Sequence, residues 1–284
     1  MFMLEDILFG NIVMPGELIR VVVAFLGTAI ATYYDIFNKK NVPDKFLYGF
    51  LAVSFVLNVV FFEESLFWFS IGVALFFSAI GYVFYRLGQL GGADVFVLAS
   101  VMLLLPIHPS FAEMSFNIPF LFSILIFSGV LFALYVMGYF GWKLSQVEAK
   151  PKLQYLLMAI PYLLFAYVYS QSFLFSPLYF AFISVLLFAT TFFMIYREPL
   201  MRLLAEELPV SQLEPEDVLA LEIMNKDMVE RYKLQRLLTE KEIERIKETK
   251  LKDVWVYTRL PPFLPFILVG MVMAILFAKY LLLF

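Results

Sequence analysis

The sequence contains no cysteine and a single histidine, His108. The missing cysteines exclude disulfides, thiolate metal centres and a cysteine nucleophile, and one histidine excludes a multi-histidine metal site. Charged residues are also scarce, at 16% of the chain, whereas soluble domains average about 25%. We therefore expect a protein that works without a metal or another cofactor.

What the chain does contain is apolar. Hydrophobic residues make up 62% of it, with 34 Phe and 16 Tyr. This composition is typical of a polytopic membrane protein, whose main partner is the lipid bilayer rather than a nucleic acid. The first residues carry acids and no basic cluster, which predicts no cleavable signal peptide.

Eight apolar runs are candidate transmembrane helices, because each approaches the roughly 17–25 residues that cross a bilayer core and none alternates with the period of a barrel strand. The fold class expected is all-α, a multi-pass membrane protein. The fourth run is short and is expected to start recessed inside the protein. The runs are 18–37, 45–62, 66–86, 93–107, 118–140, 154–170, 176–195 and 262–282.

Basic and non-basic connections alternate along the chain. Lysine or arginine follows runs one, three, five and seven, whereas the connections between them are acidic or neutral. Because basic loops stay in the cytosol, both termini are predicted to face outward. Arg20 and Lys279 lie near outer ends, where we expect their side chains to snorkel to the membrane surface.

Three regions are predicted from these patterns. Residues 1–196 form a membrane domain, 197–260 a small cytosolic insertion, and 261–284 a final transmembrane helix. The insertion holds more than half of the charged side chains. Its 215–238 segment has apolar residues at helical spacing, and Thr239 followed by Glu242 is a capping pair. We therefore expect a mostly helical insertion.

Two aspartates at the edges of apolar runs are the candidate catalytic residues, because an ionisable group in a membrane segment is costly and usually functional. Asp35 lies near the inner end of the first run, and Asp94 opens the fourth behind Gly91, Gly92 and Ala93. The topology places both at one membrane depth. The sequence therefore predicts that they meet across a helix interface.

Two carboxylates at short range share a proton, which makes one an acid and the other a base able to activate water. The glycines beside Asp94 permit close approach of an extended peptide. Simpler explanations exist for each residue alone: Asp94 as a helix cap, and Asp35 as an interfacial carboxylate paired with a lysine. A proton-coupled transporter that uses both as relay groups is a further alternative.

The motifs around both aspartates resemble the G-x-G-D membrane aspartic proteases, and among them the archaeal prepilin and preflagellin peptidases. The first match is "YYDIFNKKNVPDKF", with Asp35, Lys39, Lys40, Pro43 and Asp44, and the second is "GGAD", residues 91–94. Ala93 stands where the signature has glycine. The stretches "PPFLPFILVG" and "EPEDVLA" are also similar to archaeal members, so the resemblance touches most of the chain.

The resemblance implies a membrane aspartic endopeptidase that removes the basic leader of type IV pilin-like or archaellin precursors. Cleavage is expected on the cytosolic side of the cell membrane, with Asp35 and Asp94 catalytic and residues 91–93 near the substrate. No methyltransferase activity is expected, because the cysteine-rich loop and methyl-donor motif are missing. A presenilin-like protease is an alternative, although "PPFLPF" does not match its Pro-Ala-Leu motif.

Several other polar residues are expected to have roles outside the chemical step. We expect Asp44 and His108 to be loop residues, and Tyr33 and Tyr34 to contact the aspartates or the membrane interface. One further hypothesis is that acidic side chains of the insertion attract the basic leader. These are Glu206, Glu207, Glu214, Glu216 and Asp217.

Overall fold

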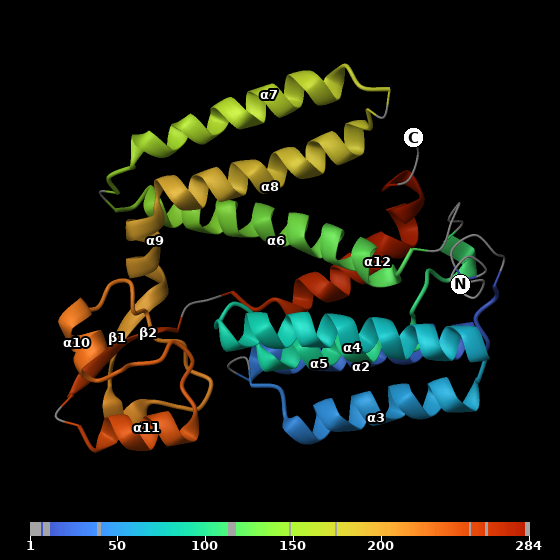
Figure 1. Ribbon diagram of the computed structural model, residues 1–284, viewed down its shortest axis with the longest axis horizontal. Helices are drawn as coiled ribbons and strands as arrows, with labels where there is room; N and C mark the ends of the chain where they lie inside the picture. The colour runs from blue at the N-terminus through green and yellow to red at the C-terminus, as the bar shows by residue number, and fades with distance from the viewer. Residues whose placement is uncertain are drawn as a thin grey trace.

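The computed structural model describes residues 7, 12–38, 41–112, 118–147, 149–173, 175–249, 251–258 and 261–281. This part of the chain is mostly helical, as predicted, and a helix lies on each predicted apolar run (Figure 1). Lys39 and Lys40 fall outside the described residues. The helices on these runs are α2 (Glu17–Phe37), α3 (Asp44–Val60), α4 (Glu64–Arg86), α5 (Gly92–Leu104), α6 (Phe120–Leu144), α7 (Ala159–Ser170, preceded by a 3-10 turn, Leu153–Met158), α8 (Pro177–Ile195) and α12 (Leu264–Leu281).

Five of these helical segments are long and apolar enough to cross a membrane: α2, α4, α6, the 153–170 segment containing α7, and α8. The chain is therefore a helical membrane protein. Two further apolar helices, Gly92–Leu104 and Leu264–Phe277, are shorter. The predicted total of eight spans remains a prediction for them and for α3.

The helices pack in two groups that α12 joins. In the first group, α5 contacts α2, α3 and α4. In the second, α6 contacts α8, and α7 packs against the outer side of α8 (Figure 1). Helix α12 packs against both α2 and α6. Gly270 permits this contact, because a Cβ at this position would lie 2.9 Å from the carbonyl oxygen of Ile124 on α6. The main hydrophobic core lies where α2, α5, α6 and α12 meet.

The segment between α8 and α12 differs from its prediction. It is not mostly helical: α9 (Arg197–Leu204), α10 (Lys226–Arg231) and α11 (Glu240–Lys247) accompany a two-stranded antiparallel sheet of β1 (Ala205–Pro209) and β2 (Asp253–Tyr257). Within the predicted 215–238 helix, only α10 is helical. Strand β2 forms because apolar β-formers alternate with more exposed residues in "DVWVY", which buries Val254 and Val256 on one face.

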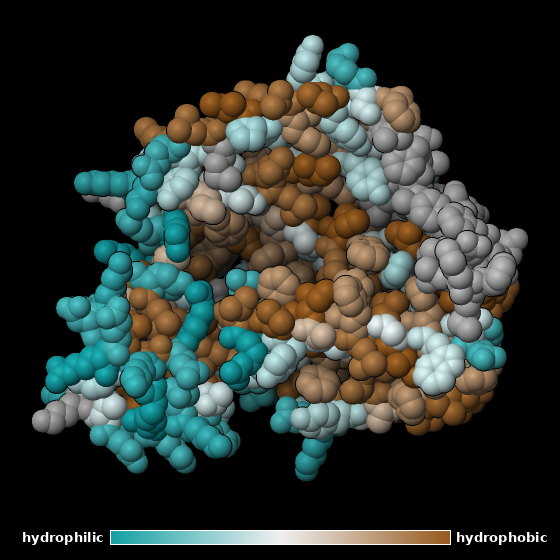
Figure 2. Space-filling model, in the orientation of Figure 1, coloured by the Kyte–Doolittle hydropathy of each residue, from teal (hydrophilic) through white to brown (hydrophobic). Residues whose placement is uncertain are grey.

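The insertion has a hydrophobic core of its own, which includes Leu219, Leu238, Ile246 and Val256. It lies at one end of the helix bundle, and its hydrophilic surface contrasts with the hydrophobic helices (Figures 1 and 2). The predicted division into a membrane domain, an insertion and a final helix stays a prediction. The exact domain boundaries and the cytosolic side remain predictions.

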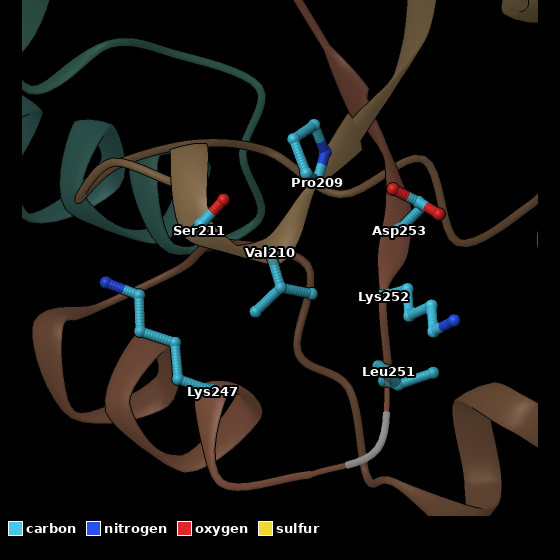
Figure 3. Close-up of a pocket in the computed structure, with 7 residues that line it drawn as sticks. All are labelled: Pro209, Val210, Ser211, Lys247, Leu251, Lys252 and Asp253. Carbon is cyan, nitrogen blue, oxygen red and sulfur yellow. The ribbon is translucent and has the colours of Figure 1, made fainter.

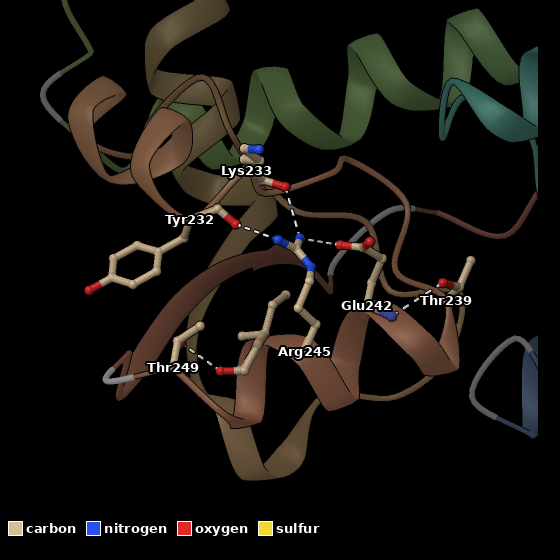
Figure 4. Close-up of polar contacts among 7 residues, drawn as sticks. Tyr232, Lys233, Thr239, Glu242, Arg245 and Thr249 are labelled. Atoms are coloured by element: carbon tan, nitrogen blue, oxygen red, sulfur yellow. Dashed lines mark hydrogen bonds and ion pairs between the residues drawn. The ribbon is translucent and has the colours of Figure 1, made fainter.

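Polar contacts fix the turn between α10 and α11 (Figure 4). Arg245 on α11 donates hydrogen bonds to the carbonyl oxygens of Tyr232 and Lys233, each at 2.8 Å, and forms an ion pair with Glu242. Thr239 accepts a hydrogen bond from the backbone N–H of Glu242, so the predicted N-cap of this helix is confirmed. These contacts hold Lys233 in the left-handed backbone conformation, with φ +47°.

Arg20 contradicts its prediction, because it does not reach the membrane surface. Its side chain is 1% exposed and donates to the carbonyl oxygens of Leu104 (3.2 Å) and Phe61 (3.0 Å), and to Asn58 (3.1 Å). The last carbonyls of a helix have no partner within it. The ends of α3 and α5 therefore offer acceptors that hold the guanidinium inside. The side chain of Lys279 is outside the described part of the structure.

Candidate active site

Asp35 lies in the last turn of α2, on the face that packs against the rest of the bundle. Its side chain is only 7% exposed, and one carboxylate oxygen accepts a hydrogen bond from the backbone N–H of Leu264, at 3.2 Å. Leu264 is the first residue of α12. Residues 229 positions apart are therefore brought together at this aspartate. Both this N–H and the positive end of α12 are directed at the Asp35 side chain.

Asp94 is the third residue of α5 and is 8% exposed. Its carboxylate reaches back to accept the backbone N–H of Gly91, at 3.0 Å, which is the acidic half of a capping box. The local capping role considered for this residue is thus present in the structure. Gly91 leaves the room it needs, because a Cβ there would lie 3.2 Å from the carboxylate oxygen.

The two aspartates lie near one another. Helices α2 and α5 pack together, and the charges of Asp35 and Asp94 interact electrostatically. The same face of α2 carries Thr28 and Thr32, whose buried hydroxyls have no hydrogen-bond partner among the described residues. A buried polar group without a protein partner is usually satisfied by water. The face of α2 that carries Asp35 thus has two buried hydroxyls that water can satisfy.

A third carboxylate, Glu216, comes from the insertion and lies against the glycine turn. It accepts a hydrogen bond from the hydroxyl of Tyr85 on α4, at 2.9 Å, and a Cβ on Gly92 would lie 3.4 Å from its oxygen. Beside it, Gly88 has φ +67° and packs on Val218. Glu216 itself has φ +72°, a left-handed conformation that is costly for a residue with a side chain. From the sequence, Glu216 is one of five acidic residues predicted to attract the basic leader. Only the fold brings it next to the motif that contains Asp94.

Other candidate residues lie elsewhere. Asp44 is the exposed first residue of α3, so the prediction that it lies in a loop is wrong. His108 is in the connection between α5 and α6, as predicted, but is buried against Phe120 with its Nε2 2.9 Å from the hydroxyl of Ser123. Burial lowers the pKa of His108 to about 4, so it is neutral at physiological pH.

Two further features of the described residues bear on ligands. They contain no group of three or more His, Asp or Glu side chains that could hold a metal ion. A shallow pocket in the insertion involves neither aspartate, and its two lysine side chains point in opposite directions (Figure 3). It is lined by Pro209, Val210, Ser211, Lys247, Leu251, Lys252 and Asp253.

The fold and the site together define a class: a helical membrane protein with two buried aspartates. Residues 22–137, a region that contains both aspartates, match the type IV leader peptidase family. The chain is also 32% identical over 109 residues to the prepilin peptidase EppA of Methanothermobacter thermautotrophicus. That alignment covers 37% of this chain and 28% of the relative. No solved structure matches the chain.

Proposed function

We propose that this protein is a membrane aspartic endopeptidase that removes the basic leader peptide from type IV pilin-like or archaellin precursors. The observation that supports the proposal is the packing of α2 against α5, which carry Asp35 and Asp94 as buried carboxyl groups inside the region that matches the peptidase family. The matched relative is itself named a prepilin peptidase. The motifs flanking both aspartates agree with the same assignment.

The proposed chemistry needs only these two side chains and water. The ionised aspartate takes a proton from the water, whose oxygen then bonds to the scissile carbonyl carbon. The protonated aspartate donates to the carbonyl oxygen as negative charge develops there. Collapse of this intermediate breaks the C–N bond, and a proton passes to the leaving amine. Peptide and water thus become one carboxylic acid and one amine, without an added cofactor.

Cleavage is proposed at the cytosolic membrane face. The insertion and the ends of α2 and α5 that carry the aspartates lie at the same end of the molecule, and the face shown in Figure 2 is most hydrophilic there (Figures 1 and 2). With eight spans, both termini would face outward. A precursor whose hydrophobic segment remains in the membrane would then present its charged leader to the aspartates from the cytosolic side.

The test is direct cleavage. The full-length protein, purified in detergent, is mixed with an archaeal pilin- or archaellin-like precursor, and the products are identified by mass spectrometry. We expect one cut immediately before the hydrophobic segment. A cut inside that segment would favour a presenilin-like protease. No cut, together with proton uptake by proteoliposomes that contain the protein, would overturn the proposal in favour of a transporter.

Glu216 is proposed to attract the basic leader, because its carboxylate lies beside the turn that carries Asp94. Glu216→Gln keeps an acceptor for Tyr85 but removes the charge. We expect kcat/KM of this variant to be roughly two- to fivefold below wild type at low salt and close to wild type at high salt. The reason is that interactions between exposed charges are weak and are screened by salt. Glu230→Gln, on the exposed surface of α10, is the control. Equal rates for both variants at low salt would remove this role.

A further inference from the structure

At the start of α12, the backbone N–H of Leu264 is directed at Asp35. The first four N–H positions of a helix have no partner within it. In α12, Pro265 has no N–H, and the nitrogens of Phe266 and Ile267 both donate to the carbonyl oxygen of Phe263, at 3.0 and 3.2 Å. The remaining nitrogen is that of Leu264, and it donates to the Asp35 carboxylate. Among residues 264–267, the N–H of Leu264 is thus the one directed at the aspartate.

This donor is held in place by α6. The ring of Phe132 on α6 packs edge-on against Phe263 and Phe266, with centroids 5.3 and 5.2 Å apart. One turn further along α12, Gly270 approaches the α6 backbone so closely that any side chain would force the helices apart. Leu264 is itself fully buried. The N–H is therefore a fixed point against which the Asp35 side chain is oriented.

From this geometry we propose that the backbone N–H of Leu264 is a positioning group for Asp35 in the hydrolytic reaction. The inference rests on the proposed function and extends the site beyond residues 22–137, the region that matches the peptidase family. A hydrogen bond to one oxygen fixes the rotation of the carboxylate. Catalysis needs this precision because small displacements of a reacting group lower rates strongly. The C-terminal helix is then part of the active site as well as a membrane helix.

Two substitutions at one position separate the N–H from the side chain. Leu264→Ala removes most of the side chain and keeps the N–H, whereas Leu264→Pro removes both. Proline is well tolerated as the first residue of a helix, since the N–H there has no partner within the helix. We expect Leu264→Pro to have a kcat about 10- to 100-fold below that of Leu264→Ala, with KM and the thermal midpoint unchanged between the two.

Equal kcat values for the two variants would overturn the proposal. If Leu264→Pro lowers the thermal midpoint or Leu264→Ala is itself inactive, replacing the 263–264 amide by an ester decides, because the ester keeps the leucine side chain and deletes only the N–H. A fully active ester variant would also overturn the proposal, and a slow, folded one would support it. Failure of the wild-type protein to cleave the precursor is a different result, which sinks the proposed function.

Discussion

Replacing either Asp35 or Asp94 with asparagine is expected to reduce leader removal on the order of 10³-fold or more, because neither amide can exchange the proton that the proposed reaction moves. The fold should survive both changes. The amide oxygen of asparagine can still accept the N–H of Leu264 at position 35, and that of Gly91 at position 94. Initial rates on a purified precursor, with thermal midpoints in the same detergent, measure the two effects separately.

The matched control is Asp44→Asn. Asp44 is exposed in the first turn of α3 and belongs to the same sequence motif as Asp35. We expect this variant to cleave at nearly the wild-type rate. If Asp35→Asn or Asp94→Asn cleaved equally well, the two-aspartate mechanism would be wrong. If instead either variant failed to fold, its aspartate would be shown to act as a helix cap first.

Arg20→Leu is expected to give the largest loss of stability. The guanidinium bonds the carbonyl oxygens at the ends of α3 and α5, and leucine leaves these buried acceptors without a donor. Hydrogen bonds to a charged group contribute about 1.5–3 kcal/mol each. A combined loss of about 3 kcal/mol would lower the thermal midpoint by roughly 6–12 °C in a chain of this size. Tryptophan fluorescence during heating in detergent measures it.

Two further variants make this experiment specific. Arg20→Lys keeps the charge but has a single side-chain nitrogen. Its thermal midpoint should fall between those of the wild type and Arg20→Leu. Arg202→Leu removes an exposed arginine from α9 and should leave the midpoint within about 2 °C of wild type. A wild-type midpoint for Arg20→Leu would mean that Arg20 does not hold α3 and α5 together.

The apolar runs predicted the helices of the membrane region because spanning segments must satisfy their own backbone and be apolar along their length. The common membrane depth of the two aspartates, inferred from their positions in alternating spans, stays a prediction. The insertion was predicted less well. Its strands β1 and β2 pair across almost fifty residues, and helical spacing in 215–238 is a local signal that this pairing and the insertion's own core override.

Arg20 shows a different limit. A basic residue near the end of an apolar run ordinarily reaches the membrane surface, and no local pattern distinguishes one that turns inward. The distinction depends on carbonyl groups of Phe61, Leu103 and Leu104, which belong to other helices. Similarly, nothing around residue 216 marks it as a neighbour of Gly92.

The sequence by itself determined that the chain is a helical membrane protein and which two carboxylates are the catalytic candidates, because hydropathy and the cost of a charge in lipid are properties of single segments. Only the tertiary structure decided what surrounds those carboxylates. The N–H of Leu264 at Asp35 and the carboxylate of Glu216 at the glycine turn come from segments more than a hundred residues away. Such contacts arise from the packing of whole helices, which no short stretch of sequence encodes.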